Sequence, residues 1–128
     1  MKPILFLLQI IVIFLINHHT MAHTTENTKS EAKVTPLMLK ALSDSPNKEA
    51  LMLTVEYPPG GETAAHRHDA HIFVYVLEGA VIMQVKGNAP VTLAAGDVFY
   101  EAPNDIHVTS KNASNSETAK FIVVSIKN

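Results

Sequence analysis

Three histidines have the residue type and spacing of a metal site. His66 and His68 stand on either side of Arg67, and His107 follows much later in the chain. Side chains at positions i and i+2 of a β-strand lie on the same face, so the first two imidazoles can converge on one point. Neutral imidazole is the commonest protein ligand for divalent transition metals. The pattern predicts a metal site with two ligands from one strand and a third from a distant strand.

The elements that must position these histidines have the pattern of β-strands. Short β-branched and apolar runs alternate with turn residues, and no long segment beyond the N-terminus shows 3.6-residue periodicity. We expect strands over residues 51–57, 72–77, 80–85, 91–93, 98–101, 106–110 and 121–126. Residues 86–88 should form a hairpin turn, and tight corners are expected at Gly60, Gly79 and Gly96. Short strands separated by regular turn signals are typical of an all-β sandwich or barrel.

The N-terminal segment predicts export. Met1-Lys2 precedes an apolar run from Ile4 to Ile16, and Thr20 and Ala22 follow it. This order is that of a secretory signal peptide, which we place at residues 1–22. An uncleaved membrane anchor is the alternative, although the apolar run is shorter than the ~20 residues that span a bilayer. We expect a periplasmic or extracellular protein with no stable membrane anchor after cleavage.

The rest of the chain divides into a lead-in and one domain. Residues 23–33 are polar and without periodicity, which predicts a disordered lead-in before a single domain at residues 34–128. The chain contains no cysteine, which excludes a cysteine nucleophile, a thiolate ligand and a lipid-anchored cysteine. It also lacks a basic patch with interleaved aromatic residues, so we expect no nucleic-acid partner.

The spacing of glycines and histidines resembles the two conserved motifs of the cupin family. The first motif, G-x5-H-x-H-x3,4-E-x6-G, is matched at Gly60, His66, His68 and Gly79. The second, G-x5-P-x-G-x2-H-x3-N, is matched at Gly96, Pro103, His107 and Asn112. In the second motif the proline and the asparagine come one residue late, and Asp105 replaces the second glycine. The resemblance covers nearly all of the mature domain and implies an RmlC-like jelly roll, the double-stranded β-helix, with a metal inside the barrel.

One departure from the family pattern concerns a metal ligand. The first motif of the family supplies a glutamate, but Ile72 holds that position here and Phe73 follows it. The resemblance therefore implies a ligand set of three histidines, namely His66, His68 and His107. Three neutral imidazoles leave a divalent ion its full +2 charge, which favours anionic ligands and acidifies a bound water.

Other residues near these motifs are open candidates. His71 would become a fourth ligand if a bulge turned it inward, and otherwise it is an exposed histidine. Glu101 and Glu78 are carboxylates that could substitute for the missing glutamate. Arg67 should point outward, and Asn112 should hold a turn. Some aromatic and methionine side chains of the strands should line the barrel interior, drawn from Phe73, Tyr75, Met83, Phe99 and Tyr100.

These features favour an exported cupin that binds a divalent transition metal and acts on, or binds, a small organic molecule. The metal could be iron, manganese, nickel, copper or zinc, and a dioxygenase-type oxidoreductase is the first chemistry to test. The alternative is a non-catalytic periplasmic module that holds a metal or a small ligand. A metal-free sugar-nucleotide epimerase would need a pair such as His66 and Tyr75, but the predicted export argues against a nucleotide-sugar substrate. The family resemblance also implies a homodimer joined through sheet edges.

Overall fold

The computed structural model describes residues 31–127, whose regular secondary structure is entirely β-strand. The ten strands are β1 (Lys33–Ala41), β2 (Glu49–Tyr57), β3 (Glu62–Thr63), β4 (His66–Arg67), β5 (Ala70–Glu78), β6 (Ala80–Val85), β7 (Val91–Ala94), β8 (Val98–Glu101), β9 (Ile106–Asn112) and β10 (Ala119–Lys127). The predicted signal peptide and residues 23–30 of the predicted lead-in lie outside this range. No helix within the described range has the length and apolar character needed to cross a bilayer.

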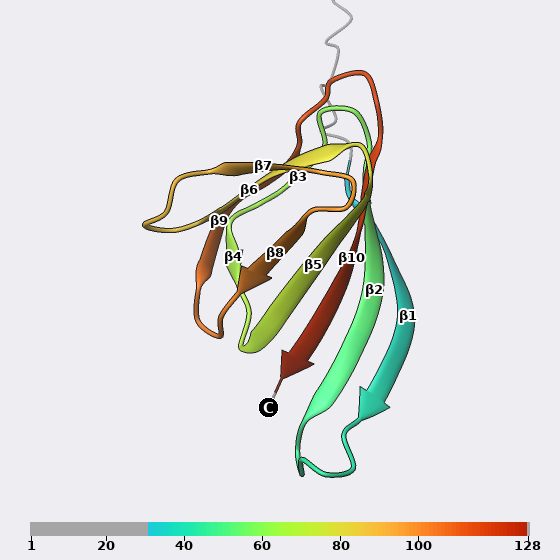
Figure 1. Cartoon of the computed structure of the whole chain (residues 1–128), viewed down its shortest axis with the longest axis vertical. Helices are drawn as coiled ribbons and strands as arrows, with labels where there is room; N and C mark the ends of the chain where they lie inside the picture. Colours follow the sequence, from blue (N-terminus) through green and yellow to red (C-terminus); the bar gives the residue numbers. More distant parts are fainter. Residues whose placement is uncertain (1–30, 128) are drawn as a thin grey trace, which may run out of the picture.

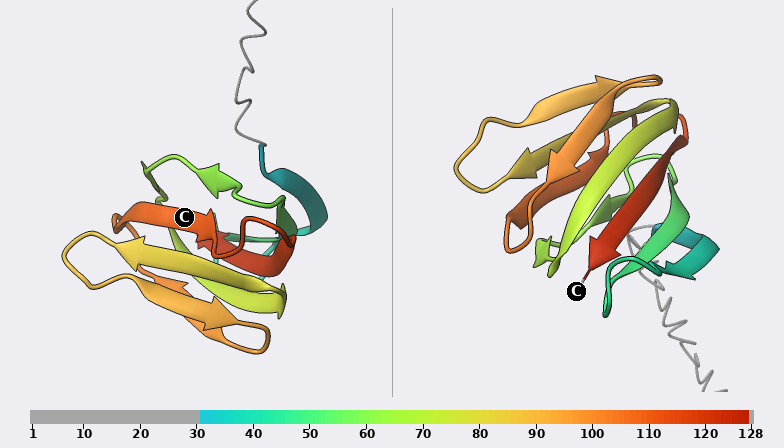
Figure 2. Two further views of the ribbon diagram at one scale, coloured as in Figure 1. Left: turned by 90° about the horizontal axis from the view of Figure 1, so that it is seen from above. Right: turned by 60° about the horizontal axis from the view of Figure 1, so that its bottom comes forward.

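The strands form two antiparallel sheets. The first sheet has the order β1-β2-β10-β5-β8, and the second has the order β3-β9-β6-β7, with β4 also paired to β9 (Figure 1). Both sheets curve around a common interior (Figure 2). β10 lies between β2 and β5 and pairs with both along most of its length. This arrangement confirms the all-β class that the turn spacing predicts.

Alternation along the strands decides which residues fill the interior. In β5, Ile72 and Val74 are buried, whereas their neighbours Phe73 and Tyr75 are exposed. Such a period of two gives one face to the core and the other to the exterior. The core cluster comprises Val55, Tyr57, Ala70, Ile72, Val74, Val76, Val81, Met83, Leu93, Ala119 and Phe121.

The predicted turn residues lie where they were expected. Gly60, Gly79 and Gly96 all have positive φ, a conformation that glycine adopts without a steric penalty. The turn between β6 and β7 is closed by the backbone N–H of Asn88, which donates to Val85 O at 3.0 Å. Of the candidate aromatic and methionine side chains, Met83 is buried and Phe99 is half-buried, whereas Phe73, Tyr75 and Tyr100 lie on the outer face.

Two strands, β1 and β3, are not among the elements expected from sequence, and the strand expected to carry both His66 and His68 ends at Arg67. β1 begins at Lys33, the last residue of the predicted lead-in, and pairs with β2 as an edge strand. β3 and β4 have two residues each. β4 is nonetheless important because it carries the first histidine of the motif against β9.

Candidate functional site

His66 and His107 lie opposite each other on paired strands. β4 and β9 run antiparallel, and their register sets His66 directly against His107. The ring centroids are 5.2 Å apart. His68 follows two residues after His66 and its ring lies 4.7 Å from that of His66, in an edge-to-face arrangement. The structure therefore brings together the three histidines that the motifs single out.

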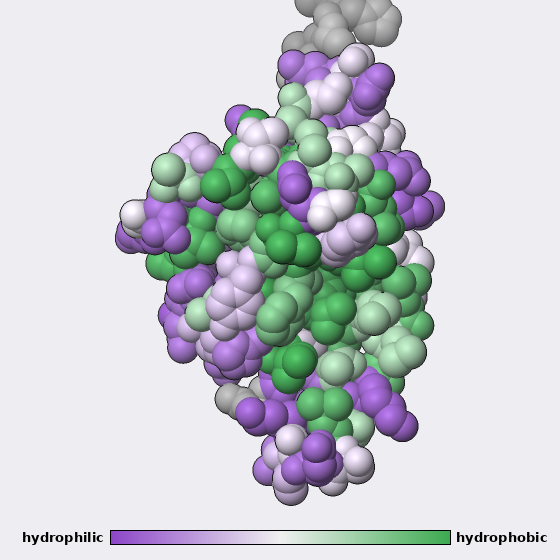
Figure 3. Space-filling model, viewed as in Figure 1, coloured by the Kyte–Doolittle hydropathy of each residue, from purple (hydrophilic) through white to green (hydrophobic). Residues whose placement is uncertain are grey.

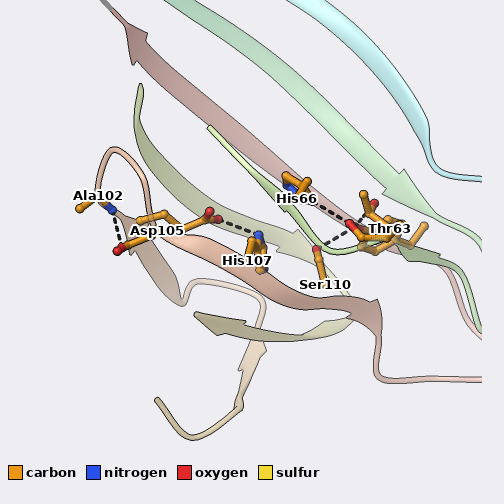
Figure 4. Close-up of polar contacts among 9 residues, drawn as sticks. Thr63, His66, Ala102, Asp105, His107 and Ser110 are labelled. Atoms are coloured by element: carbon orange, nitrogen blue, oxygen red, sulfur yellow. Dashed lines mark hydrogen bonds and ion pairs between the residues drawn. The ribbon is translucent and has the colours of Figure 1, made fainter. Parts of the chain in front are cut away.

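The turn before β9 helps to place these histidines. The Asp105 carboxylate accepts the backbone N–H of Ala102 at 2.8 Å and so closes the turn from Ala102 to Asp105 (Figure 4). Asn104 has a positive φ in this turn, and its backbone N–H donates to His68 O at 3.1 Å. The turn thus joins the chain around His68 to the start of β9. Asp105, which departs from the family pattern, fixes this turn with its side chain.

The ring nitrogens of two histidines are held as they are in many metal sites. His66 Nδ1 lies 2.8 Å from Ala64 O, and because a carbonyl oxygen can only accept, Nδ1 carries the proton. His107 Nδ1 lies 2.9 Å from Glu101 Oε1. Metal-ligating histidines almost always donate their second N–H to a carbonyl or a carboxylate, which leaves the other nitrogen to bind the ion. Here that other nitrogen is Nε2 in both rings.

His107 Nε2 is the atom that most clearly lacks a partner. It is fully buried and has no hydrogen-bond partner. A buried polar atom in this state costs free energy unless something binds it. Two imidazoles bound to one ion through ~2.1 Å bonds have ring centroids about 4.6–5.3 Å apart, a range that includes both separations given above. The residues present therefore suit a transition metal.

The ring orientations nevertheless stop short of a formed metal centre. Within residues 31–127, no three His, Asp or Glu side chains already have the arrangement of a metal site. The two ring separations fit neighbouring ligands, but the three histidines do not together form a group that could hold an ion in this structure. Binding of an ion would therefore require these side chains to move.

Burial affects the protonation of His68. Desolvation lowers the pKa of His68, the positive charge that His66 can carry lowers it further, and the negative charge of Glu101 opposes both. A lowered pKa favours the neutral imidazole, which is the form that binds metals.

A cavity of about 270 Å³ adjoins the histidines. The three histidines and Glu101 are among its polar lining residues, and most of the remaining wall is apolar, including Ile72, Val74, Met83 and Phe121. Neither lysine nor arginine lines it. The lining thus combines a few polar side chains with a mostly apolar wall.

A second polar group in the cavity was not singled out from sequence. The Tyr57 hydroxyl lies 2.6 Å from Thr63 Oγ1 and 2.7 Å from Ser110 Oγ. Figure 4 shows Ser110 on β9, the strand that also carries His107, and Thr63 lies on β3, just before the strand that carries His66. Burial is the main cause that raises the pKa of Tyr57. No motif in the sequence marks these three residues, because they meet only through strand pairing.

The remaining candidates lie away from the three histidines. His71 is exposed on the outer face of β5, where its Nδ1 lies 2.8 Å from the Tyr100 hydroxyl. The strand has no bulge there that would turn His71 inward, so the structure does not bring it to the site. Arg67 points outward as expected, and Glu78 is exposed at the end of β5.

Asn112 ties together the segments around the cavity. Its side-chain amide N–H groups lie within hydrogen-bond distance of the carbonyls of Tyr57, Pro58 and Glu117, and its Oδ1 accepts the backbone N–H of Ser114. The side chain is buried. The prediction that Asn112 holds a turn is confirmed, and the residue also joins the end of β2 to the loop before β10.

Comparison with known proteins places this fold among cupins. Residues 53–125 match the cupin domain family. Among solved structures, the Cnp3 cupin domain of Schizosaccharomyces pombe is 18% identical with a TM-score of 0.62, and the alignment covers 76% of this chain and 61% of that one. A cupin-like protein from Thermotoga maritima is 26% identical with a TM-score of 0.59, over 73% of this chain and 67% of that one.

A third similar structure is the DMSP lyase DddQ from Ruegeria pomeroyi, 20% identical with a TM-score of 0.60. The alignment covers 73% of this chain but only 46% of the lyase. The chain thus spans less than two thirds of both the Cnp3 domain and the lyase. No curated protein sequence matches it. The family match over most of the strands, together with the two-sheet fold, shows that this chain belongs to the cupin family.

Proposed function

We propose that this cupin holds a divalent transition metal through His66, His68 and His107 and binds a small organic molecule in the adjoining cavity. The observation that carries the proposal is the buried Nε2 of His107, which has no partner while Nδ1 of the same ring is held by Glu101. The second support is His66, whose Nδ1 is held by a backbone carbonyl. Both rings thus have one nitrogen fixed and the other available for an ion.

The chain's own residues would bind and orient the substrate. A metal held there would supply Lewis-acid polarisation or activation of water or dioxygen. The apolar wall would exclude water and pack against the body of the substrate, and the polar side chains would orient one oxygen-bearing group. Because no lysine or arginine lines the cavity, a phosphate or polyanion would find no permanently cationic side chain there. We expect a small, mainly apolar molecule with a single acidic or carbonyl end.

A dioxygenase-type oxidoreductase is the first reaction to test. The neutral donor set is of the three-histidine kind, and an enolate or phenolate end on the substrate would complement the undiminished metal charge. Oxygen uptake that depends on both metal and candidate substrate is the expected result. The similar fold of a lyase shows how far chemistry varies on this scaffold, so the reaction type must come from experiment.

A non-catalytic binding module is the second candidate. It is favoured by the hydroxyls of Tyr57, Thr63 and Ser110, which bond to one another and leave no poised general base among them. For a binder, a metal or ligand should raise the thermal midpoint without oxygen uptake or product formation.

The experiment that tests the metal site is elemental analysis of the purified protein beside a His66→Ala/His68→Ala variant. We expect near-stoichiometric iron, manganese, nickel, copper or zinc in the wild type and loss of the metal in the double variant. His71→Ala is the matched control, because that histidine is exposed on the outer face and should not affect the metal content. Equal metal in all three proteins, or metal in none after reconstitution, would contradict the proposal.

We also propose that the chain is exported and forms a homodimer. The N-terminal residues carry the order of a signal peptide, and the cleaved protein would begin at His23. N-terminal sequencing of the exported protein checks this start. The support for a dimer is the edge strand β1, all of whose residues are exposed.

A further inference from the structure

The glutamate that the family motif lacks here has a counterpart on the neighbouring strand. Ile72 holds the motif position on β5, and the register of β5 with β8 sets Ile72 directly against Glu101. Both side chains are buried on the inner face. The carboxylate therefore enters the same region of the barrel from the adjacent strand, 29 positions later in the sequence.

We propose that Glu101 is a positioning residue which holds His107 in the Nδ1–H tautomer and so presents Nε2 as the donor atom of the site. This inference rests on the proposed metal site for its purpose, but its central statement concerns the metal-free protein. It assigns the carboxylate to orientation of a ligand and not to coordination of the ion.

The geometry around His107 supports this role. Glu101 Oε1 lies 2.9 Å from His107 Nδ1, and the two side chains are only 4% and 5% exposed. Phe99 lies two residues before Glu101 on the same face of β8, and its ring centroid is 6.0 Å from that of His107. One strand thus supplies both an acceptor at the edge of the imidazole and a ring beside it.

If the Glu101–His107 pair only stabilised the fold, we would expect a different pattern of hydrogen bonds at the His107 ring. Glu101 occupies one ring nitrogen only, and the second remains buried without a partner. A buried imidazole that served packing alone would have both nitrogens satisfied, because an unpaired polar atom is destabilising. The carboxylate holds the ring by Nδ1, and His107 is one of the residues that line the cavity.

The first test reads the tautomer directly, by nitrogen NMR of the imidazoles in metal-free protein. It is performed at about pH 8, where free imidazole is neutral. We expect the Nδ1–H form of His107 in the wild type and in Glu101→Gln, whose amide oxygen can still accept. In Glu101→Leu the Nε2–H form, which free histidine prefers, should grow. Wild-type His107 in the Nε2–H form, or no change in Glu101→Leu, would overturn the inference.

The second test separates positioning from coordination. Zinc affinity is measured by competition, and the Co²⁺ absorption spectrum is recorded for each variant. For a positioning residue, Glu101→Gln should bind zinc within about threefold of the wild type with an unchanged Co²⁺ spectrum. Glu101→Leu should bind roughly 10- to 100-fold more weakly. A large loss in Glu101→Gln with an altered Co²⁺ spectrum would make Glu101 a ligand and overturn the inference.

The control is Glu78→Gln, which removes a carboxylate that is exposed at the end of β5. It should change neither the tautomer nor the affinity. If Glu101→Leu does not fold, the wild-type tautomer and the Glu101→Gln comparison still decide the matter. If no protein binds metal but wild-type His107 is in the Nδ1–H form, the proposed metal function fails while the positioning role stands.

Discussion

Tyr57 shows how one buried residue organises the cavity wall. Its side chain is 1% exposed, its ring packs edge-on against Phe121 at 5.4 Å, and its hydroxyl contacts both Thr63 and Ser110. The hydroxyl therefore joins the first sheet, through β2, to β3 and β9 of the second sheet. Removing it would leave two hydroxyls without their shared partner.

The raised pKa of Tyr57 predicts an alkaline loss of stability. Because the folded pKa lies above the unfolded value of about 10, stability is fully present below pH ~10 and is lost as pH rises through the folded pKa. Tyr57→Phe should lower the free energy of unfolding by about 1–3 kcal/mol at neutral pH, because the variant lacks both hydrogen bonds of the hydroxyl. Between neutral and alkaline pH, its free energy of unfolding should then fall less than that of the wild type. Urea unfolding at about pH 7 and pH 10.5 measures both effects.

Tyr75→Phe is the control for that experiment, since Tyr75 is exposed on the outer face. It should match the wild type at both pH values. If the free energy of unfolding falls equally with rising pH in the wild type and in Tyr57→Phe, Tyr57 does not contribute to the alkaline loss of stability.

At the scale of elements, the turn glycines differ in what surrounds them. Gly79 joins β5 to β6 with φ of +68°, and a Cβ there would lie 2.7 Å from Thr118 O and 3.1 Å from Ala119 Cα. Gly87, in the turn after β6, has φ of +90°, but a Cβ there would meet nothing within 4 Å. Both positions need positive φ, and only the first is also closed by backbone atoms.

This contrast predicts unequal costs for the same substitution. Gly87→Ala should lower the free energy of unfolding by about 1–2 kcal/mol, the penalty of a left-handed conformation. Gly79→Ala should cost more, about 2–4 kcal/mol, because the chain at Thr118 and Ala119 must also move. Chemical denaturation of the two variants compares them. Equal losses would mean that the contact with the start of β10 relaxes freely.

Sequence reasoning succeeds for elements with clear ends. β6 and β8 occupy the residues expected of them, since turn residues bound both. It gives no separate strand at β1, where Pro36 and a register shift between Pro36 and Met38 interrupt the pattern. The two-residue strands β3 and β4 are too short to show alternation. These two segments form strands because both pair with β9, and their own sequences contain no strand pattern.

Sequence reasoning likewise predicts some residues of the candidate site and misses the role of another. The motif spacing predicts that His66, His68 and His107 lie close together, and their rings do so in the structure, because a family pattern records residues that meet in space. From sequence, Glu101 is only one of two carboxylates that could replace the missing glutamate. Its position opposite Ile72 depends on the register of β5 with β8, which the sequence does not reveal. Its hold on His107 depends in turn on the packing of two sheets. Neither relation leaves a periodic signal in the chain.

At the scale of the whole molecule, apolar side chains remain exposed in two places. Every residue of the edge strand β1 is exposed, and Met38 and Leu39 are 58% and 63% exposed. The outer face of the first sheet presents Phe73, Tyr75 and Tyr100, and Figure 3 shows apolar residues gathered over β5, β10 and β2. A long apolar edge strand invites pairing with another strand.

We expect the protein to be a dimer joined at β1. Met38→Lys/Leu39→Lys places charge on the edge and should shift the molecule to a monomer, as sedimentation or light scattering will measure. Val98→Lys, on the outer face of β8, is the control and should remain dimeric. A monomeric wild type would contradict the homodimer, and a monomer in the control alone would move the interface to the outer face.

The central place of β10 governs when the first sheet can form. Of the described strands it comes last in the chain, yet it separates β2 from β5 and pairs with both (Figure 1). While the ribosome is still making the earlier strands, β2 and β5 have no neighbour between them, and the growing chain keeps two open edges. Contacts between distant segments also make folding slow. The first sheet can therefore be completed only after β10, the last of the described strands, has been made.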